Sequence, residues 1–135
     1  MYLRSLLLLI ALLPLTACSE PPYTNIDNQQ LKTLQAQGVP VYDIRRTEEW
    51  AQTGVVEGSK RLTFVDDKGR VNPEFVEKFT SAVNKNDPVI LICRTGNRTD
   101  TLSRALVEQL GYTKIYNVKN GISRWISEGL PVVRN

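Results

Sequence analysis

Residues 88–98 read Pro-Val-Ile-Leu-Ile-Cys-Arg-Thr-Gly-Asn-Arg. The unbroken apolar run 89–92 is typical of a strand that is buried on both faces of a parallel sheet. The polar residues after it predict a loop that turns into a helix, so Cys93 is expected at the carboxyl end of a buried strand. Because α/β folds present their chemistry at that edge of the sheet, the stretch favours an α/β domain with a functional thiol.

Helix-like and strand-like segments alternate along the rest of the chain. Helices are predicted over 27–38, 48–52, 72–83, 97–110 and 121–128, and strands over 39–44, 59–64, 89–92 and 114–118. This alternation predicts an α/β fold with a mainly parallel central sheet of about five strands and helices on both faces.

Capping residues and apolar periodicity set the expected helix ends and faces. Asp27 is expected to cap the first helix, with Gln30 in the capping-box position, and Thr47 to cap the second. Asn72 before a proline is a good helix start. The residues predicted to face inward are Phe75, Val76, Phe79, Ala82 and Val83; Leu102, Ala105, Leu106 and Leu110; and Ile122, Trp125 and Ile126.

The first residues resemble a bacterial lipoprotein signal. Arg4 precedes an apolar run over 6–13, which is too short to span a bilayer and is typical of a secretory signal. The stretch Leu15-Thr16-Ala17-Cys18 resembles a lipobox. That resemblance implies cleavage before Cys18 and acylation of this cysteine with palmitate or similar chains. The alternative is an ordinary signal peptide with an incidental Cys18.

This interpretation divides the chain into a signal peptide over 1–17, a lipidated Cys18 with a tether over 18–25, and one domain over 26–135. Acyl chains would hold the protein at a bacterial membrane. Ser19 follows Cys18 where lipoproteins kept in the inner membrane commonly carry Asp, so the outer membrane facing the periplasm is the expected location. A Gram-positive host would place the protein on the outer face of the cell membrane.

Composition excludes several classes of function. The chain contains no histidine, which excludes Ser-His-Asp triads, Cys-His dyads and histidine metal sites. Loss of residues 1–17 removes only Arg4 from the 17 basic and 14 acidic side chains, and so mild an excess does not indicate nucleic-acid binding. Lipidation of Cys18 would leave Cys93 as the single free thiol, which suggests reactivity rather than a disulfide. No metal or organic cofactor is expected.

The loop after the buried strand predicts a thiol in an anion-binding environment. Backbone N–H groups of residues 94–98 can curl around the Cys93 sulfur, and the following helix points its positive end at the same place. These groups favour the charged form of sulfur, so Cys93 should ionise more readily than free cysteine. The residues expected to bind the anion are Arg94, Thr95, Gly96, Asn97 and Arg98.

Two further segments flank this loop. Residues 43–50 read Asp-Ile-Arg-Arg-Thr-Glu-Glu-Trp, and residues 117–125 read Asn-Val-Lys-Asn-Gly-Ile-Ser-Arg-Trp. With the loop over 93–98, these segments resemble the signatures of the rhodanese family of sulfurtransferases. The resemblance implies that Cys93 takes a sulfane sulfur from a small anionic donor such as thiosulfate. It further implies a persulfide that passes its sulfur to cyanide or to a thiol, including a protein thiol, with ping-pong kinetics.

Several alternatives stay open at this point. The loop of protein tyrosine phosphatases is one residue longer, and Thr99 stands here in the place of its arginine, which disfavours phosphatase or arsenate reductase chemistry. Cys93 could be a buried structural thiol. The domain could also be a non-enzymatic sulfur carrier or a module that binds a partner protein.

Asp43 and Arg45 follow another predicted strand and are expected at the same edge of the sheet. They could support the pocket around the loop. The favoured interpretation is a structural ion pair with Glu48 or Glu49.

Overall fold

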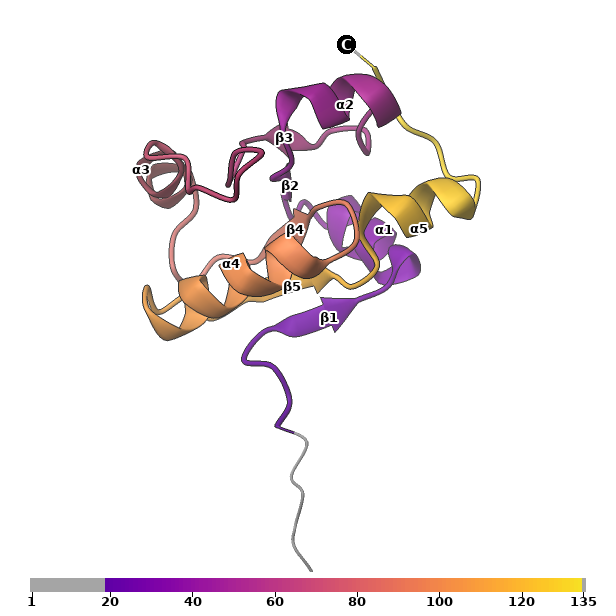
Figure 1. Cartoon of the computed structure of the whole chain (residues 1–135). Coiled ribbons are helices and arrows are strands. Elements are labelled where there is room, and N and C mark those ends of the chain that lie inside the picture. Colours follow the sequence, from indigo (N-terminus) through magenta and orange to yellow (C-terminus); the bar gives the residue numbers. More distant parts are fainter. Residues whose placement is uncertain (1–18, 135) are drawn as a thin grey trace, which may run out of the picture.

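The computed structural model describes residues 19–134, which form five helices around a five-stranded sheet (Figure 1). The strands are β1 (Thr24–Ile26), β2 (Val41–Asp43), β3 (Lys60–Arg61), β4 (Val89–Ile92) and β5 (Ile115–Val118). The helices are α1 (Asn28–Ala36), α2 (Thr47–Thr53), α3 (Phe75–Ala82), α4 (Asn97–Glu108) and α5 (Gly121–Ser127). The strand order is β1-β5-β4-β2-β3 and every pairing is parallel, so the predicted α/β fold is confirmed.

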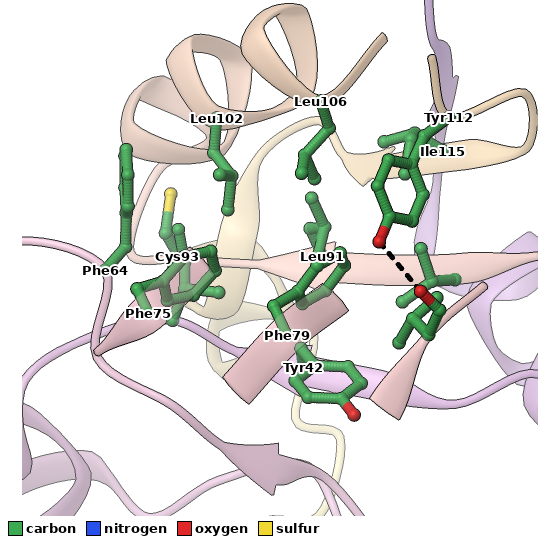
Figure 2. Close-up of a cluster of buried hydrophobic side chains, with 13 residues drawn as sticks. Tyr42, Phe64, Phe75, Phe79, Leu91, Cys93, Leu102, Leu106, Tyr112 and Ile115 are labelled. Atoms are coloured by element: carbon green, nitrogen blue, oxygen red, sulfur yellow. Dashed lines mark hydrogen bonds between the residues drawn. The ribbon is translucent and has the colours of Figure 1, made fainter. Parts of the chain in front are cut away.

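Helices cover both faces of the sheet, and each face has its own apolar cluster. On one face α3 and α4 pack on the sheet through aromatic and aliphatic side chains (Figure 2). On the other face α1 and α5 do so, chiefly through Leu31, Ile122 and Trp125. Strand β4 supplies both clusters, because Val89 and Leu91 face α3 and α4 while Ile90 and Ile92 face α1 and α5.

The central position of β4 explains its uniformly apolar sequence. Its four side chains are fully buried, and burial stabilises each by roughly 1.5–3 kcal/mol relative to exposure. A charged side chain at any of these positions would be buried among apolar neighbours, which explains why the strand carries none. Cys93 follows at the carboxyl end of this strand.

The helix starts agree with the sequence in part. Asp27 caps α1 as predicted, since its carboxylate accepts from the Gln30 N–H at 2.8 Å and the Gln30 side chain accepts from the Asp27 N–H at 2.9 Å. The prediction that Thr47 caps α2 is wrong. The cap is Arg46, whose N–H donates to the Glu49 carboxylate at 3.0 Å.

Helix α3 begins at Phe75 rather than at Asn72. The Asn72 side chain accepts from the Glu74 N–H at 3.2 Å, which closes a turn ahead of the helix. The inward faces are also narrower than predicted, because Val76, Ala82 and Ile126 are exposed. In α3 only the stripe at four-residue spacing, Phe75, Phe79 and Val83, reaches the core.

The strand predicted over 59–64 is shorter in the structure, where β3 covers only Lys60–Arg61 at the edge beside β2. The Leu62 and Phe64 N–H groups still donate to the Asp43 and Ile44 carbonyls. At the opposite edge, β1 begins inside the segment that the sequence assigns to the tether. Tyr23, just before this strand, donates a hydrogen bond to the Asp100 carboxylate of α4. The proposed signal peptide and Cys18 lie outside the described residues. Among residues 19–134, no helix has the length and apolar character needed to cross a membrane.

Candidate active site

Cys93 is the first residue after β4, at the carboxyl edge of the sheet. Asp43, the last residue of β2, pairs in register with Ile92, and Leu91 pairs with Asn117 of β5. The ends of β2 and β5 therefore flank the cysteine. Helix α4 begins four residues further on, so the strand–loop–helix arrangement predicted around the thiol is present.

Two groups contact the sulfur within hydrogen-bond distance. The Gly96 N–H donates to Sγ at 3.2 Å, and the Thr99 hydroxyl lies 3.3 Å from Sγ. Of the five amides predicted to curl around the sulfur, all within the described residues, only that of Gly96 is at this distance. The sulfur thus sits in a partial rather than a complete ring of donors.

Gly96 turns the loop in a way that no other residue could. Its φ is +97°, in the left-handed region, and a Cβ there would lie 2.1 Å from the carbonyl oxygen of Lys119. The missing side chain lets the loop lie directly against the end of β5. The backbone that Gly96 approaches belongs to Lys119, the residue just after β5.

The N-terminus of α5 holds the loop from the other side. The Ile122 N–H donates to the Cys93 carbonyl at 2.9 Å, and the Ser123 N–H donates to the Arg94 carbonyl at 3.1 Å. A Cβ at Gly121 would lie 2.3 Å from the Arg94 carbonyl oxygen. The sequence indicates Gly121 only as a helix start, and nothing in its local pattern shows that it touches the loop.

The Cys93 side chain is fully buried. Figure 2 shows its sulfur beside Phe64 and Leu102, in the cluster that also contains Phe75. The readily ionised thiol expected from the sequence stays a prediction. Any reaction at this sulfur requires an opening above it.

The two arginines of the loop have different surroundings. Arg94 is exposed, and its side chain makes no ion pair or hydrogen bond to the described part of the chain. Arg98 is half-buried, and both of its terminal nitrogens donate hydrogen bonds to the Glu49 carboxylate of α2, at 2.8 and 2.7 Å. This fork-to-carboxylate geometry is the strongest form of an arginine ion pair. Thr95 and Asn97 are exposed.

The ion pair shifts the titration of both partners. Burial alone would raise the pKa of Glu49, but hydrogen bonds from Arg98 and the Arg46 amide, with the charges of both arginines, lower the pKa to about 2. The hydrogen bond to Glu49 raises the pKa of Arg98 against the effect of its burial, and the Cys93 sulfur and the Asp43 carboxylate add to the rise. The guanidinium thus lies within electrostatic range of the sulfur while its charge is balanced by Glu49.

Asp43 and Arg45 form a buried ion pair with each other, with N and O atoms 2.8 Å apart. The predicted pairing with Glu48 or Glu49 is wrong, because Glu48 pairs with Arg46 and Glu49 with Arg98. Both side chains are at most 1% exposed, and Arg45 also donates to the Gly54 carbonyl at 3.0 Å. The pair ties the end of β2 to the end of α2, because Arg45 also donates to the Thr53 hydroxyl at 2.8 Å.

Sequence reasoning missed two side chains of the site. Thr99 contacts the sulfur, and the only signal for it in the sequence is its place in the first turn of the helix that follows the cysteine loop. Glu49 orients Arg98 from 49 positions away, and its spacing to the loop carries no periodic signal. Among residues 19–134, no group of three or more Cys, Asp or Glu side chains could hold a metal ion.

The fold and the cysteine loop together define the class: a parallel α/β domain with a single thiol at the carboxyl end of its central strand. A model of the Rhodanese-like domain matches residues 27–128, and the chain belongs to this family. It is 31% identical over 113 residues to thiosulfate sulfurtransferase 18 of Arabidopsis thaliana, covering 80% of this chain and 82% of the relative. It is 30% identical over 140 residues to rhodanese-like domain-containing protein 17 of the same plant, covering 96% and 88%.

Among solved structures, the chain is similar to a rhodanese-related protein from Thermoplasma volcanium. The TM-score is 0.64 at 27% sequence identity, and the match covers 84% of this chain and all of the other. Relatives of this chain are thus named both as sulfurtransferases and simply as rhodanese-like domains.

Proposed function

We propose that this protein is a sulfurtransferase that carries a sulfane sulfur on Cys93 as a persulfide. The observation that carries the proposal is the contact between the Cys93 sulfur and the Gly96 N–H at the end of β4. A donor aimed at the sulfur favours both a thiolate and the terminal charge of a persulfide. Membership of a family with named thiosulfate sulfurtransferases supports it.

The reaction has two steps. The Cys93 thiolate attacks the outer sulfur of thiosulfate, a new S–S bond forms, and the S–S bond of thiosulfate breaks with its electron pair leaving on sulfite. Cyanide or a thiolate then attacks the terminal sulfur of the persulfide. Thiocyanate or a new persulfide leaves, and the Cys93 thiolate returns. Electrons and atoms balance without a further reactant.

The two arginines have different tasks in this proposal. Arg94, exposed and unpaired within the described residues, attracts and orients the sulfonate end of the donor. Arg98 is fixed by Glu49 and holds positive charge beside the sulfur. Thr95 and Asn97 are exposed on the loop and can donate to the donor's oxygens.

The test is the intact mass of the full chain carrying Cys18→Ser, in which Cys93 is the single thiol. The expected result is a gain of one sulfur atom after thiosulfate, reversed by cyanide and absent when Cys93→Ser is added. Absence of the gain with a thiol that is shown to be reduced, and that reacts with a small alkylating reagent, would refute thiosulfate as donor.

The burial of Cys93 favours a second candidate, a sulfur carrier or partner-binding module that turns over poorly alone. In such a protein a docked partner would open the site and supply or accept the sulfur. Fast turnover with thiosulfate and a small thiol would favour the enzyme. Slow turnover, with rapid sulfur transfer to a protein thiol, would favour the carrier.

We also propose that Cys18 is lipidated and anchors the domain at a membrane, with the outer membrane facing the periplasm as the expected site. Support comes from the lipobox-like sequence alone. Metabolic labelling with a palmitate analogue should label the wild-type chain and leave Cys18→Ser unlabelled. Labelling that persists in Cys18→Ser, or a wild-type chain found only in soluble fractions, would refute the anchor.

A further inference from the structure

The Thr99 hydroxyl has one hydrogen and two neighbours that could accept it. Its oxygen lies 3.1 Å from the Gly96 carbonyl oxygen and 3.3 Å from the Cys93 sulfur. Thr99 is fully buried, so water does not offer a substitute partner. Where that single hydrogen points therefore depends on the state of the sulfur.

A protonated sulfur satisfies every group in this arrangement. The S–H donates to the Thr99 oxygen, and the Thr99 hydroxyl donates to the Gly96 carbonyl. A charged sulfur has no hydrogen to give, and in a buried site it requires donors of its own. The Gly96 N–H is one such donor.

The Gly96 carbonyl can release the hydroxyl at little cost. It also accepts the Asp100 N–H at 3.0 Å, in the first turn of α4. It therefore keeps a hydrogen bond when the hydroxyl turns away. A charge-assisted hydrogen bond to sulfur replaces a neutral one to a carbonyl, and charge-assisted bonds are the stronger kind.

We propose that Thr99 is a positioning residue whose hydroxyl hydrogen turns from the Gly96 carbonyl to the Cys93 sulfur whenever that sulfur is charged. The inference rests on the proposed function, because the thiolate and the persulfide are the charged species of that cycle. In this proposal the Thr99 hydroxyl is the second hydrogen-bond donor to the charged sulfur, beside the Gly96 N–H.

Other charged groups near the sulfur set the background for this switch. Arg98 of α4 lies within electrostatic range of the sulfur, with its charge balanced by Glu49 of α2, and Asp43 lies at the end of β2, paired with Arg45. On the remaining side the neighbours are the apolar Phe64, Phe75 and Leu102. None of these partners changes when the Thr99 hydroxyl is removed, so a substitution at this position isolates the hydroxyl.

The experiment is a thiolate titration by ultraviolet absorbance on the full chain carrying Cys18→Ser, with Cys93→Ser in the same background as the blank. Thr99→Val keeps the shape of the side chain but removes the hydroxyl. Thr99→Ala removes the hydroxyl without overfilling the site, and Thr99→Ser keeps the hydroxyl. We expect the midpoint to rise by about one pH unit in the Val and Ala variants, or about tenfold less thiolate at neutral pH, and to stay near wild type in the Ser variant.

Unchanged midpoints in both Thr99→Val and Thr99→Ala would overturn the inference, as would a Thr99→Ser midpoint that moves as far as theirs. If one of the two variants fails to fold, the other decides. The titration uses no sulfur donor. A wild-type chain that gains no sulfur from thiosulfate but shows the expected shift would therefore refute the sulfur transfer and leave the role of Thr99 standing.

Discussion

Replacing Glu49 with Gln should destabilise the protein at neutral pH and flatten its acid unfolding. The substitution removes the negative charge that two nitrogens of Arg98 contact at 2.7 and 2.8 Å. The side chain of Glu49 is 7% exposed and that of Arg98 is 21% exposed, so the remaining guanidinium would be half-buried without its partner. Removing one member of a buried pair leaves a charge that water cannot fully solvate.

The size of the effect follows from the titration of Glu49. Its pKa falls from an ordinary 4.5 to about 2 on folding, so the unfolded chain binds more protons between these values. The stabilisation is fully present above about pH 4.5 and is lost as the pH falls through about 2. At roughly 1.36 kcal/mol per unit, the difference sets an upper limit of about 3 kcal/mol. Because Arg98 is partly hydrated, we expect a loss of about 2 kcal/mol at neutral pH.

Urea unfolding of the wild type and Glu49→Gln, at neutral pH and at about pH 3, measures the loss of stability at neutral pH and its dependence on acid. The wild type should lose more stability between the two conditions than the variant does, since other carboxylates titrate equally in both. Glu48→Gln is the matched control. Glu48 pairs with Arg46 at the surface, and its replacement should leave the free energy of unfolding close to that of the wild type, because water screens exposed ion pairs. Equal acid sensitivity of the wild type and Glu49→Gln would refute the reasoning.

Three further substitutions test other parts of the site. Gly96→Ala should lower the free energy of unfolding by about 3 kcal/mol or more, measured by thermal or urea unfolding. Gly69 has a similar positive φ, but an added Cβ would meet nothing within 4 Å, so Gly69→Ala should lower it by only about 1 kcal/mol. Asp43→Asn leaves the Arg45 charge buried and should cost about 3 kcal/mol by the same assay; a loss below about 1 kcal/mol would contradict the buried pair. Arg94→Ala should leave stability within about 0.5 kcal/mol and slow persulfide formation from thiosulfate about fivefold at low salt, an effect that added salt should reduce.

The sequence predicts the layout of the fold because its signals are local. The apolar run of β4 coincides with the observed strand, and the capping box at Asp27 begins α1 as expected. The predictions fail where contacts with a distant segment determine the local structure. Thr24 and Asn25 read as a polar tether, yet they form β1 because the exposed edge of β5 offers unpaired backbone groups. Val76 and Ile126 read as core, but the helices present only a narrow stripe to the sheet.

The candidate site divides in the same way. The position of Cys93 at the end of a strand and the turn at Gly96 follow from residues adjacent in sequence. The contacts of α5 with the Cys93 and Arg94 carbonyls join residues 29 positions apart, and they are made by backbone amides that any residue except proline carries. No pattern of side chains could indicate them. Gly121 is the residue whose identity reflects these contacts, because a Cβ at this position would collide with the Arg94 carbonyl.

Charge around the loop shows why a motif alone is an incomplete guide to mechanism. From the sequence alone, Arg94 and Arg98 are expected to be two equivalent charges beside the sulfur. In the folded chain Glu49 balances the charge of Arg98, whereas Arg94 is exposed and makes no ion pair with the described residues. Phe64, from a segment between β3 and α3, lies beside the buried sulfur. The loop sequence therefore points to the Cys93 sulfur, while the neighbours of that sulfur and the charge balance of Arg98 depend on residues tens of positions away.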